Sequence, residues 1–73
     1  MREDFTIIFE PAEEGGFTAY IPELPGANSE GKTIEEARSM VLDAARELLA
    51  YRRARALSQK AVGSVVERTS LSQ

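Results

Sequence analysis

The chain is short and lacks two chemically important residue types. It has 73 residues, the length of one small domain, and it contains no cysteine and no histidine. Disulfide bonds are therefore excluded, and a zinc site would have to consist of carboxylates alone, which is unusual. No apolar run reaches the roughly 18 residues of a membrane-spanning helix, and the N-terminus lacks the apolar stretch of a signal peptide. We therefore expect a single domain over residues 1–73, located in the cytoplasm, with no metal and no cofactor.

A domain of this length has a thin hydrophobic core, because it buries only about 60% of the surface that its unfolded chain exposes. Small domains commonly gain further stability from disulfides, a metal or self-association. Since the first two are excluded or unusual here, we expect a homo-oligomer, although domains of this length also fold alone.

The charges are divided unevenly along the chain, whose formal net charge is −3. Residues 1–36 carry nine acidic and two basic residues, a balance of −7, whereas residues 37–73 carry seven basic and three acidic residues, a balance of +4. An acidic half steers a basic partner toward itself. The two halves would equally attract each other, within one chain or between subunits, and the sequence leaves both interpretations open.

The first 30 residues have the pattern of strands. Apolar side chains alternate over residues 5–10 and again over 17–21, which is typical of strands with one apolar face. Pro11 ends the first run, and the Gly15–Gly16 pair permits a tight turn, so the two runs predict an antiparallel hairpin. Residues 22–26 contain two prolines and a glycine and predict an irregular corner before a short third strand over 27–30.

A helix is predicted over residues 34–56. Thr33 and Glu36 have the spacing of a capping box, in which Glu36 also reaches back to the Thr33 N–H. Apolar residues then recur at steps of three and four, while the arginines near residue 55 suit the negative end of the helix dipole.

Two features of the predicted elements favour self-association. The apolar stripe of the helix is wider than a sheet of short strands can cover, and an open strand edge can pair across a two-fold axis. The candidate oligomer interface comprises Leu48, Leu49, Tyr51, Leu57 and Val65.

A final strand is predicted over residues 61–71, with Gly63 marking a bend or bulge before it. The element order is then β-β-β-α-β, an α+β fold in which one long helix covers one face of a mostly antiparallel sheet.

Two segments of the chain resemble a known family. Residues 15–26, which read GGFTAYIPELPG, resemble the signature of HicB-like antitoxin domains, and residues 30–37, EGKTIEEA, resemble the segment that begins the helix in that family. The resemblance covers about residues 5–50. The motif positions in the loops and at the helix cap are Gly15, Gly16, Pro22, Leu24, Pro25, Gly26, Thr33 and Glu36.

The resemblance implies a β-β-β-α-β fold likened to a truncated RNase H fold. Members of the family commonly neutralise HicA, a small basic RNA-cleaving toxin, by masking its RNA-binding face and its catalytic histidine. They often assemble as dimers or tetramers. Many also carry a C-terminal DNA-binding domain, for which these 73 residues leave no room.

Enzymatic activity is not expected from these residues. A two-metal nuclease needs several converging carboxylates, whereas the first predicted strand has Glu10 at its end, and the chain lacks a histidine base. Without histidine, a serine also has no partner to activate it as a nucleophile. The Gly15–Gly16 pair leads into a strand instead of opening a helix, which favours a hairpin turn over a phosphate-binding loop.

Four arginines offer a possible contact with nucleic acid, but a pI near 4.9 argues against direct binding. They are Arg46, Arg52, Arg53 and Arg55. The alternative is a solvated helix end that matches the helix dipole.

Residues 22–26 also allow two interpretations. They form either a functional loop or, as we favour, a rigid connection in which Leu24 fills the edge of the core.

The sequence thus favours a protein-binding module that masks a HicA-like toxin stoichiometrically. On charge alone, the candidate contacts with a basic toxin are Glu13, Glu14, Glu23 and Glu30. The alternative is an orphan homo-oligomeric domain of the same fold, without a toxin partner and with another interaction or ligand.

Overall fold

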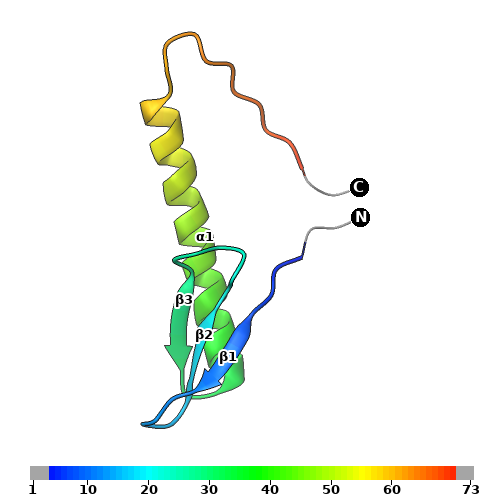
Figure 1. Ribbon diagram of the computed structural model, residues 1–73, viewed down its shortest axis with the longest axis vertical. Coiled ribbons are helices and arrows are strands. Elements are labelled where there is room, and N and C mark those ends of the chain that lie inside the picture. Colours follow the sequence, from blue (N-terminus) through cyan, green and yellow to red (C-terminus); the bar gives the residue numbers. More distant parts are fainter. Residues whose placement is uncertain (1–3, 71–73) are drawn as a thin grey trace.

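The computed structural model describes residues 4–70, which form three strands followed by one helix. The strands are β1 (Ile8–Pro11), β2 (Phe17–Tyr20) and β3 (Asn28–Gly31), and the helix is α1 (Ile34–Gln59). The strands form an antiparallel sheet in the order β1-β2-β3, and α1 packs on β3 and β2. Figure 1 shows that the sheet covers the first half of the helix, whereas the second half projects beyond it. The predicted α+β arrangement is confirmed for these four elements.

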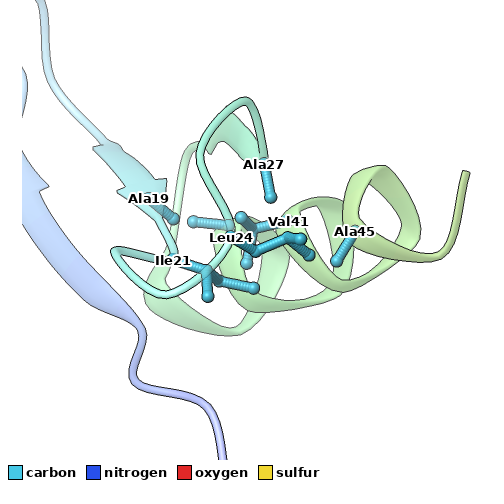
Figure 2. Packing of buried hydrophobic residues seen from close by; sticks show 7 residues of the cluster. Ala19, Ile21, Leu24, Ala27, Val41 and Ala45 are labelled. Atoms are coloured by element: carbon cyan, nitrogen blue, oxygen red, sulfur yellow. The ribbon is translucent and has the colours of Figure 1, made fainter. Parts of the chain in front are cut away.

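The hydrophobic core lies between one face of the sheet and the first half of α1 (Figure 2). Pairing of Phe9 with Ala19, and of Ala19 with Ser29, places alternate residues of all three strands on this face. Four of the seven buried residues are alanines, which allows the helix backbone to approach the sheet closely. The buried residues are Ala19, Ile21, Leu24, Ala27, Ala37, Val41 and Ala45.

Two glycines of the sequence motifs lie where backbone segments meet. A Cβ atom on Gly31 would lie 2.5 Å from the backbone nitrogen of Ala37 in α1, and one on Gly16 would lie 2.5 Å from the carbonyl oxygen of Gly31. Gly16 also has a φ of 79°, in the left-handed region that favours glycine. The hairpin turn, β3 and the start of α1 therefore fit together only without side chains at these positions.

The predicted helix cap is confirmed, with one difference in its hydrogen bonds. The Thr33 hydroxyl accepts from the Glu36 N–H at 3.1 Å. The Glu36 carboxylate accepts from the N–H of Lys32 at 2.8 Å, one residue before the predicted donor, Thr33. Lys32 thus also has its N–H satisfied, and the turn that leads into α1 is fixed on both sides.

The helix is longer at its C-terminal end than predicted, since it ends at Gln59 and not near residue 56. The last side chain of α1 packed against the core is Leu48, and residues 49–70 are all exposed. The interpretation of Arg52, Arg53 and Arg55 as last-turn residues is wrong, because the last turn contains no basic residue.

The connection between β2 and β3 is a folded corner. The Leu24 N–H donates to the Ile21 carbonyl oxygen and the Ala27 N–H to the Leu24 carbonyl oxygen, each at 3.0 Å. Leu24 is buried in the core, whereas Pro22 and Pro25 are exposed. These contacts favour the interpretation of residues 22–26 as a rigid connection.

The predicted final strand is not formed in the single chain. Residues 61–70 belong to no strand, and the last predicted residue, Leu71, lies outside the described part of the chain. Gly63, with a φ of 87°, does mark a turn, in which the Ser64 N–H donates to the Ala61 carbonyl oxygen at 3.1 Å. The strand does not form because α1 is long. The helix continues for eleven residues, or about 16 Å, past Leu48, so the tail begins beyond the sheet.

The first strand begins later than predicted, at Ile8 instead of residue 5. Ile8 pairs with Tyr20, the last residue of β2, so β2 provides no strand partner for residues 5–7. The N–H of Thr6 donates instead to the Glu23 carboxylate.

Candidate functional site

Three of the four acidic residues predicted to contact a partner lie together. The hairpin turn between β1 and β2 is fixed by hydrogen bonds from the Ala12 N–H to the Gly16 carbonyl oxygen at 3.0 Å and from the Gly15 N–H to the Ala12 carbonyl oxygen at 3.1 Å. This turn and the end of β3 border one open depression. We call it the acidic depression, and it is lined by Ala12, Glu13, Glu14, Gly15, Gly16, Glu30 and Lys32.

The acidic depression is a solvated surface and not an enclosed pocket. Its three carboxylates belong to exposed residues, Glu13, Glu14 and Glu30, and Lys32 is the one cation among its lining residues. Within residues 4–70, no polar or charged side chain is buried. An open surface of net negative charge suits electrostatic contact with a cationic protein surface better than capture of a small molecule.

Glu23, the fourth predicted contact, lies apart from the acidic depression and is engaged within the chain. Its carboxylate accepts from the Thr6 hydroxyl at 2.6 Å and from the Thr6 N–H at 2.9 and 3.1 Å. The hydroxyl, and after it the N–H, hold the pKa of the Glu23 carboxyl below its usual value, because both hydrogen bonds favour the charged form. Glu23 therefore ties the segment before β1 to the corner after β2.

We expect this contact to make stability depend on pH. Because the pKa of Glu23 is lower in the folded chain than in the unfolded chain, its contribution is present near neutral pH and is lost as pH falls through the folded pKa. Glu23→Gln should therefore lose less stability than the wild type on acidification, measured as urea midpoints at several pH values. The matched control is Glu14→Gln, which removes a second exposed carboxylate but leaves the contact between Glu23 and Thr6 in place. Identical pH profiles for the wild type and Glu23→Gln would contradict the role assigned to this contact.

Three of the four arginines considered for nucleic-acid binding have partners within the chain. Arg52 donates from Nη2 to the Pro25 carbonyl oxygen at 2.8 Å, which joins α1 to the corner after β2. Arg46 pairs with Asp43 at 3.0 Å, and Arg55 donates to the Tyr51 hydroxyl at 3.0 Å. Sequence reasoning missed the structural role of Arg52, because its partner is a backbone atom 27 residues away.

The residues predicted to form an oligomer interface do not share one face of α1. Leu48 packs against the core, whereas Leu49, Tyr51 and Leu57 are exposed. Tyr51 lies two residues after Leu49 and six before Leu57, roughly 200° and 240° around the helix, so it points to the side opposite these two leucines. The fifth residue, Val65, lies in the tail after α1 and is exposed.

Two further findings concern metals and membranes. Among residues 4–70, no three acidic side chains are grouped so that they could hold a metal ion. In the same part of the chain, no helix is both long and apolar enough to cross a lipid bilayer.

The fold and the exposed acidic depression define a small α+β domain with an open acidic surface. The chain is 48% identical over 44 residues to a UPF0150 protein from Synechocystis, which is 60% of this chain and 61% of that protein. It is also 45% identical over 40 residues to the protein named Antitoxin HicB 1 from Photorhabdus laumondii, which is 55% of this chain and 26% of the antitoxin. These similarities confirm the resemblance to HicB-like antitoxin domains that the motifs indicated.

The chain covers less than two thirds of each of these relatives. No family model matches the chain, and no solved structure matches it.

Proposed function

We propose that this chain is an antitoxin-type module that binds a small, basic, HicA-like ribonuclease toxin and blocks it stoichiometrically in the cytoplasm. The observation that carries the proposal is the acidic depression, in which Glu13 and Glu14 from one turn meet Glu30 from β3. The similarity to a protein named Antitoxin HicB 1 supports the same role. The chain would act by binding and without catalysis.

Masking requires a surface that is rigid before the partner arrives, since ordering flexible groups on binding costs free energy. The turn that carries Glu13 and Glu14 is closed by two backbone hydrogen bonds. Gly16 and Gly31 hold this turn against β3 and the start of α1 through their close backbone approach. The acidic side chains thus stand on a fixed backbone, which favours rapid electrostatic association with a cationic surface.

The alternative function is that of an orphan homo-oligomeric domain without a toxin partner. The observation in its favour is the tail after α1, where Val65 and Val66 are exposed although their residue type favours burial. Such a domain would use its exposed apolar residues for self-association and leave the acidic depression without a specific partner.

Charge reversal in the acidic depression tests the proposal. The double variant Glu13→Lys, Glu14→Lys should bind a HicA-like toxin about tenfold or more weakly at low salt, mostly through slower association. The difference should shrink as salt is raised, because exposed charges are screened. Binding kinetics at two salt concentrations measure both effects.

The matched control is Glu47→Lys, Glu67→Lys, which changes the net charge equally but lies outside the acidic depression. This variant should bind nearly as the wild type does. Equal weakening by both double variants would mean that net charge and not the acidic depression guides the partner, and this would contradict the proposed site.

A further inference from the structure

The strand β3 borders the sheet, and its outer edge presents backbone groups that the sheet does not use (Figure 1). Opposite residues of two antiparallel strands alternately exchange hydrogen bonds and direct their backbone groups away from each other. The Ile21 N–H donates to the Ala27 carbonyl oxygen at 3.1 Å, which makes these two a hydrogen-bonded pair just before β3. By this alternation, Asn28 and Glu30 direct their N–H and C=O groups away from β2, toward the open edge.

The next residue in this series, Lys32, shows that the edge can be bonded from outside. Its N–H donates to the Glu36 carboxylate at 2.8 Å, which closes the edge at the end of β3. Nearer the start of β3, no strand within residues 4–70 lies beside Asn28 or Glu30 on this side. The outward N–H groups of these two residues are therefore available to an acceptor from another molecule.

The opposite edge of the sheet, formed by β1, suits an added strand less well. Pro11 lacks an N–H and so cannot exchange hydrogen bonds with Phe17, the residue opposite it in β2. By the same alternation, Pro11 and Phe9 face outward, and Phe9 alone of these two offers an N–H there. Proline on an edge strand is a common protection against pairing.

One side of α1 lies beside the open edge of β3. The helix begins over the end of β3, where the backbones of Gly31 and Ala37 are in close contact. The guanidinium of Arg38 lies 5.6 Å from the centre of the Phe9 ring, which identifies the side of α1 that faces β1. Met40 follows two residues later, roughly 200° around the helix, and so faces the opposite side, beyond β3. It is 48% exposed, an apolar surface next to the edge.

The charge around this edge favours a basic occupant. Glu30 borders the acidic depression together with Glu13 and Glu14, and Lys32 is the one cation among the lining residues. Pairing of β3 with β3 of a second copy would bring like charges together, which destabilises a sheet. A basic segment would instead be attracted to the edge.

We propose that the basic partner attaches at the outer edge of β3 by adding an extended segment of its own chain as a fourth strand. In this mode of recognition, main-chain hydrogen bonds supply affinity and alternate side chains supply specificity. The segment bonds to the backbone of Asn28 and Glu30. An apolar side chain on its helix side contacts Met40, and basic side chains on its other face reach the acidic depression. The inference rests on the proposed function, since it specifies how the same partner is held.

Amide hydrogen exchange of the wild type, alone and saturated with a HicA-like toxin, tests the inference. The amides of Asn28 and Glu30 should exchange fast in the free chain and at least tenfold more slowly in the complex, because the added strand accepts hydrogen bonds from them. The control amide is that of Phe9, at the opposite edge, which should exchange equally in both samples. Toxin binding without protection of Asn28 and Glu30 would overturn this inference and leave the proposed function standing. Absence of binding would overturn both.

Two substitutions at one position separate the backbone contact from the charge. Glu30→Pro and Glu30→Gln both remove the carboxylate, but only proline also removes the N–H, and an edge strand tolerates proline where its N–H faces solvent. Glu30→Pro should release the toxin about tenfold faster than Glu30→Gln does, because a carbonyl group of the partner loses its donor. Equal dissociation rates would contradict strand addition.

Truncation of an exposed side chain of α1 gives a further test that leaves the sheet unchanged. Met40→Ala should weaken toxin binding about fivefold, since the added strand covers this side chain. The matched control is Leu49→Ala, because Leu49 is 39% exposed and lies roughly 180° around the helix from Met40. This control should bind as the wild type does. Equal affinities of the two variants would contradict the placement of the partner strand beside α1.

Discussion

Gly31→Ala should lower the free energy of unfolding by about 3 kcal/mol, at the upper end of the usual costs of overpacking. The new Cβ atom would lie 2.5 Å from the backbone nitrogen of Ala37 and 2.9 Å from the carbonyl carbon of Glu36. Both neighbours belong to the helix backbone, which cannot move aside as a flexible side chain can. Small domains have total stabilities of about 5 kcal/mol or little more, so the loss should leave a marginally folded protein.

Gly15→Ala is the control for Gly31→Ala. Gly15 has a φ of 96°, but a Cβ atom there would meet nothing within 4 Å. The cost should be about 1 kcal/mol, from backbone strain alone. Urea denaturation at equal protein concentration measures both variants, since association would change the apparent stability. If Gly31→Ala proves no more harmful than Gly15→Ala, the close approach of β3 and α1 is contradicted.

Val41→Ala should lower the free energy of unfolding by about 2 kcal/mol, from two buried methyl groups and the cavity that they leave. Val41 is 0% exposed and is the largest fully buried side chain among the described residues. In a domain of this length, the loss corresponds to a decrease of roughly 8–16 °C in the Tm. Thermal unfolding followed by circular dichroism measures it.

The control makes the same chemical change at an exposed position. Val62 is fully exposed in the turn after α1, so Val62→Ala should change the free energy of unfolding by less than about 0.5 kcal/mol. Similar Tm values for the two variants would show that the contacts around Val41 do not form the core.

The sequence predicted the elements whose signals are local. The cap at Thr33 depends on side chains within three residues of it, and the structure confirms it. The hairpin was predicted from alternation on both sides of two glycines, and the turn at Gly63 from a single glycine that indeed has a positive φ. The clustering of Glu13 and Glu14 near Glu30 was not predicted, and it depends on the pairing of β2 with β3, in which Thr18 lies opposite Glu30.

The remaining features depend on atoms far apart in the sequence. Glu23 and Thr6 are 17 residues apart in the sequence, and Arg52 and Pro25 are 27 residues apart. No local sequence pattern predicts either contact. The prediction of a final strand is wrong for the single chain because the helix was predicted to end too early, near residue 56. A strand-forming sequence becomes a strand only next to a free edge of a sheet. Because α1 ends at Gln59, the tail begins beyond the sheet of its own chain.

The most direct test of the proposed function is a titration of RNA cleavage by a HicA-like toxin with increasing amounts of this chain. Cleavage should fall in proportion to the chain added and stop at a fixed ratio of chain to toxin, because masking consumes one binding surface per toxin. Glu13→Lys, Glu14→Lys should need a larger excess than the wild type at low salt. Undiminished cleavage with the chain in large excess would contradict the antitoxin role and favour the orphan domain.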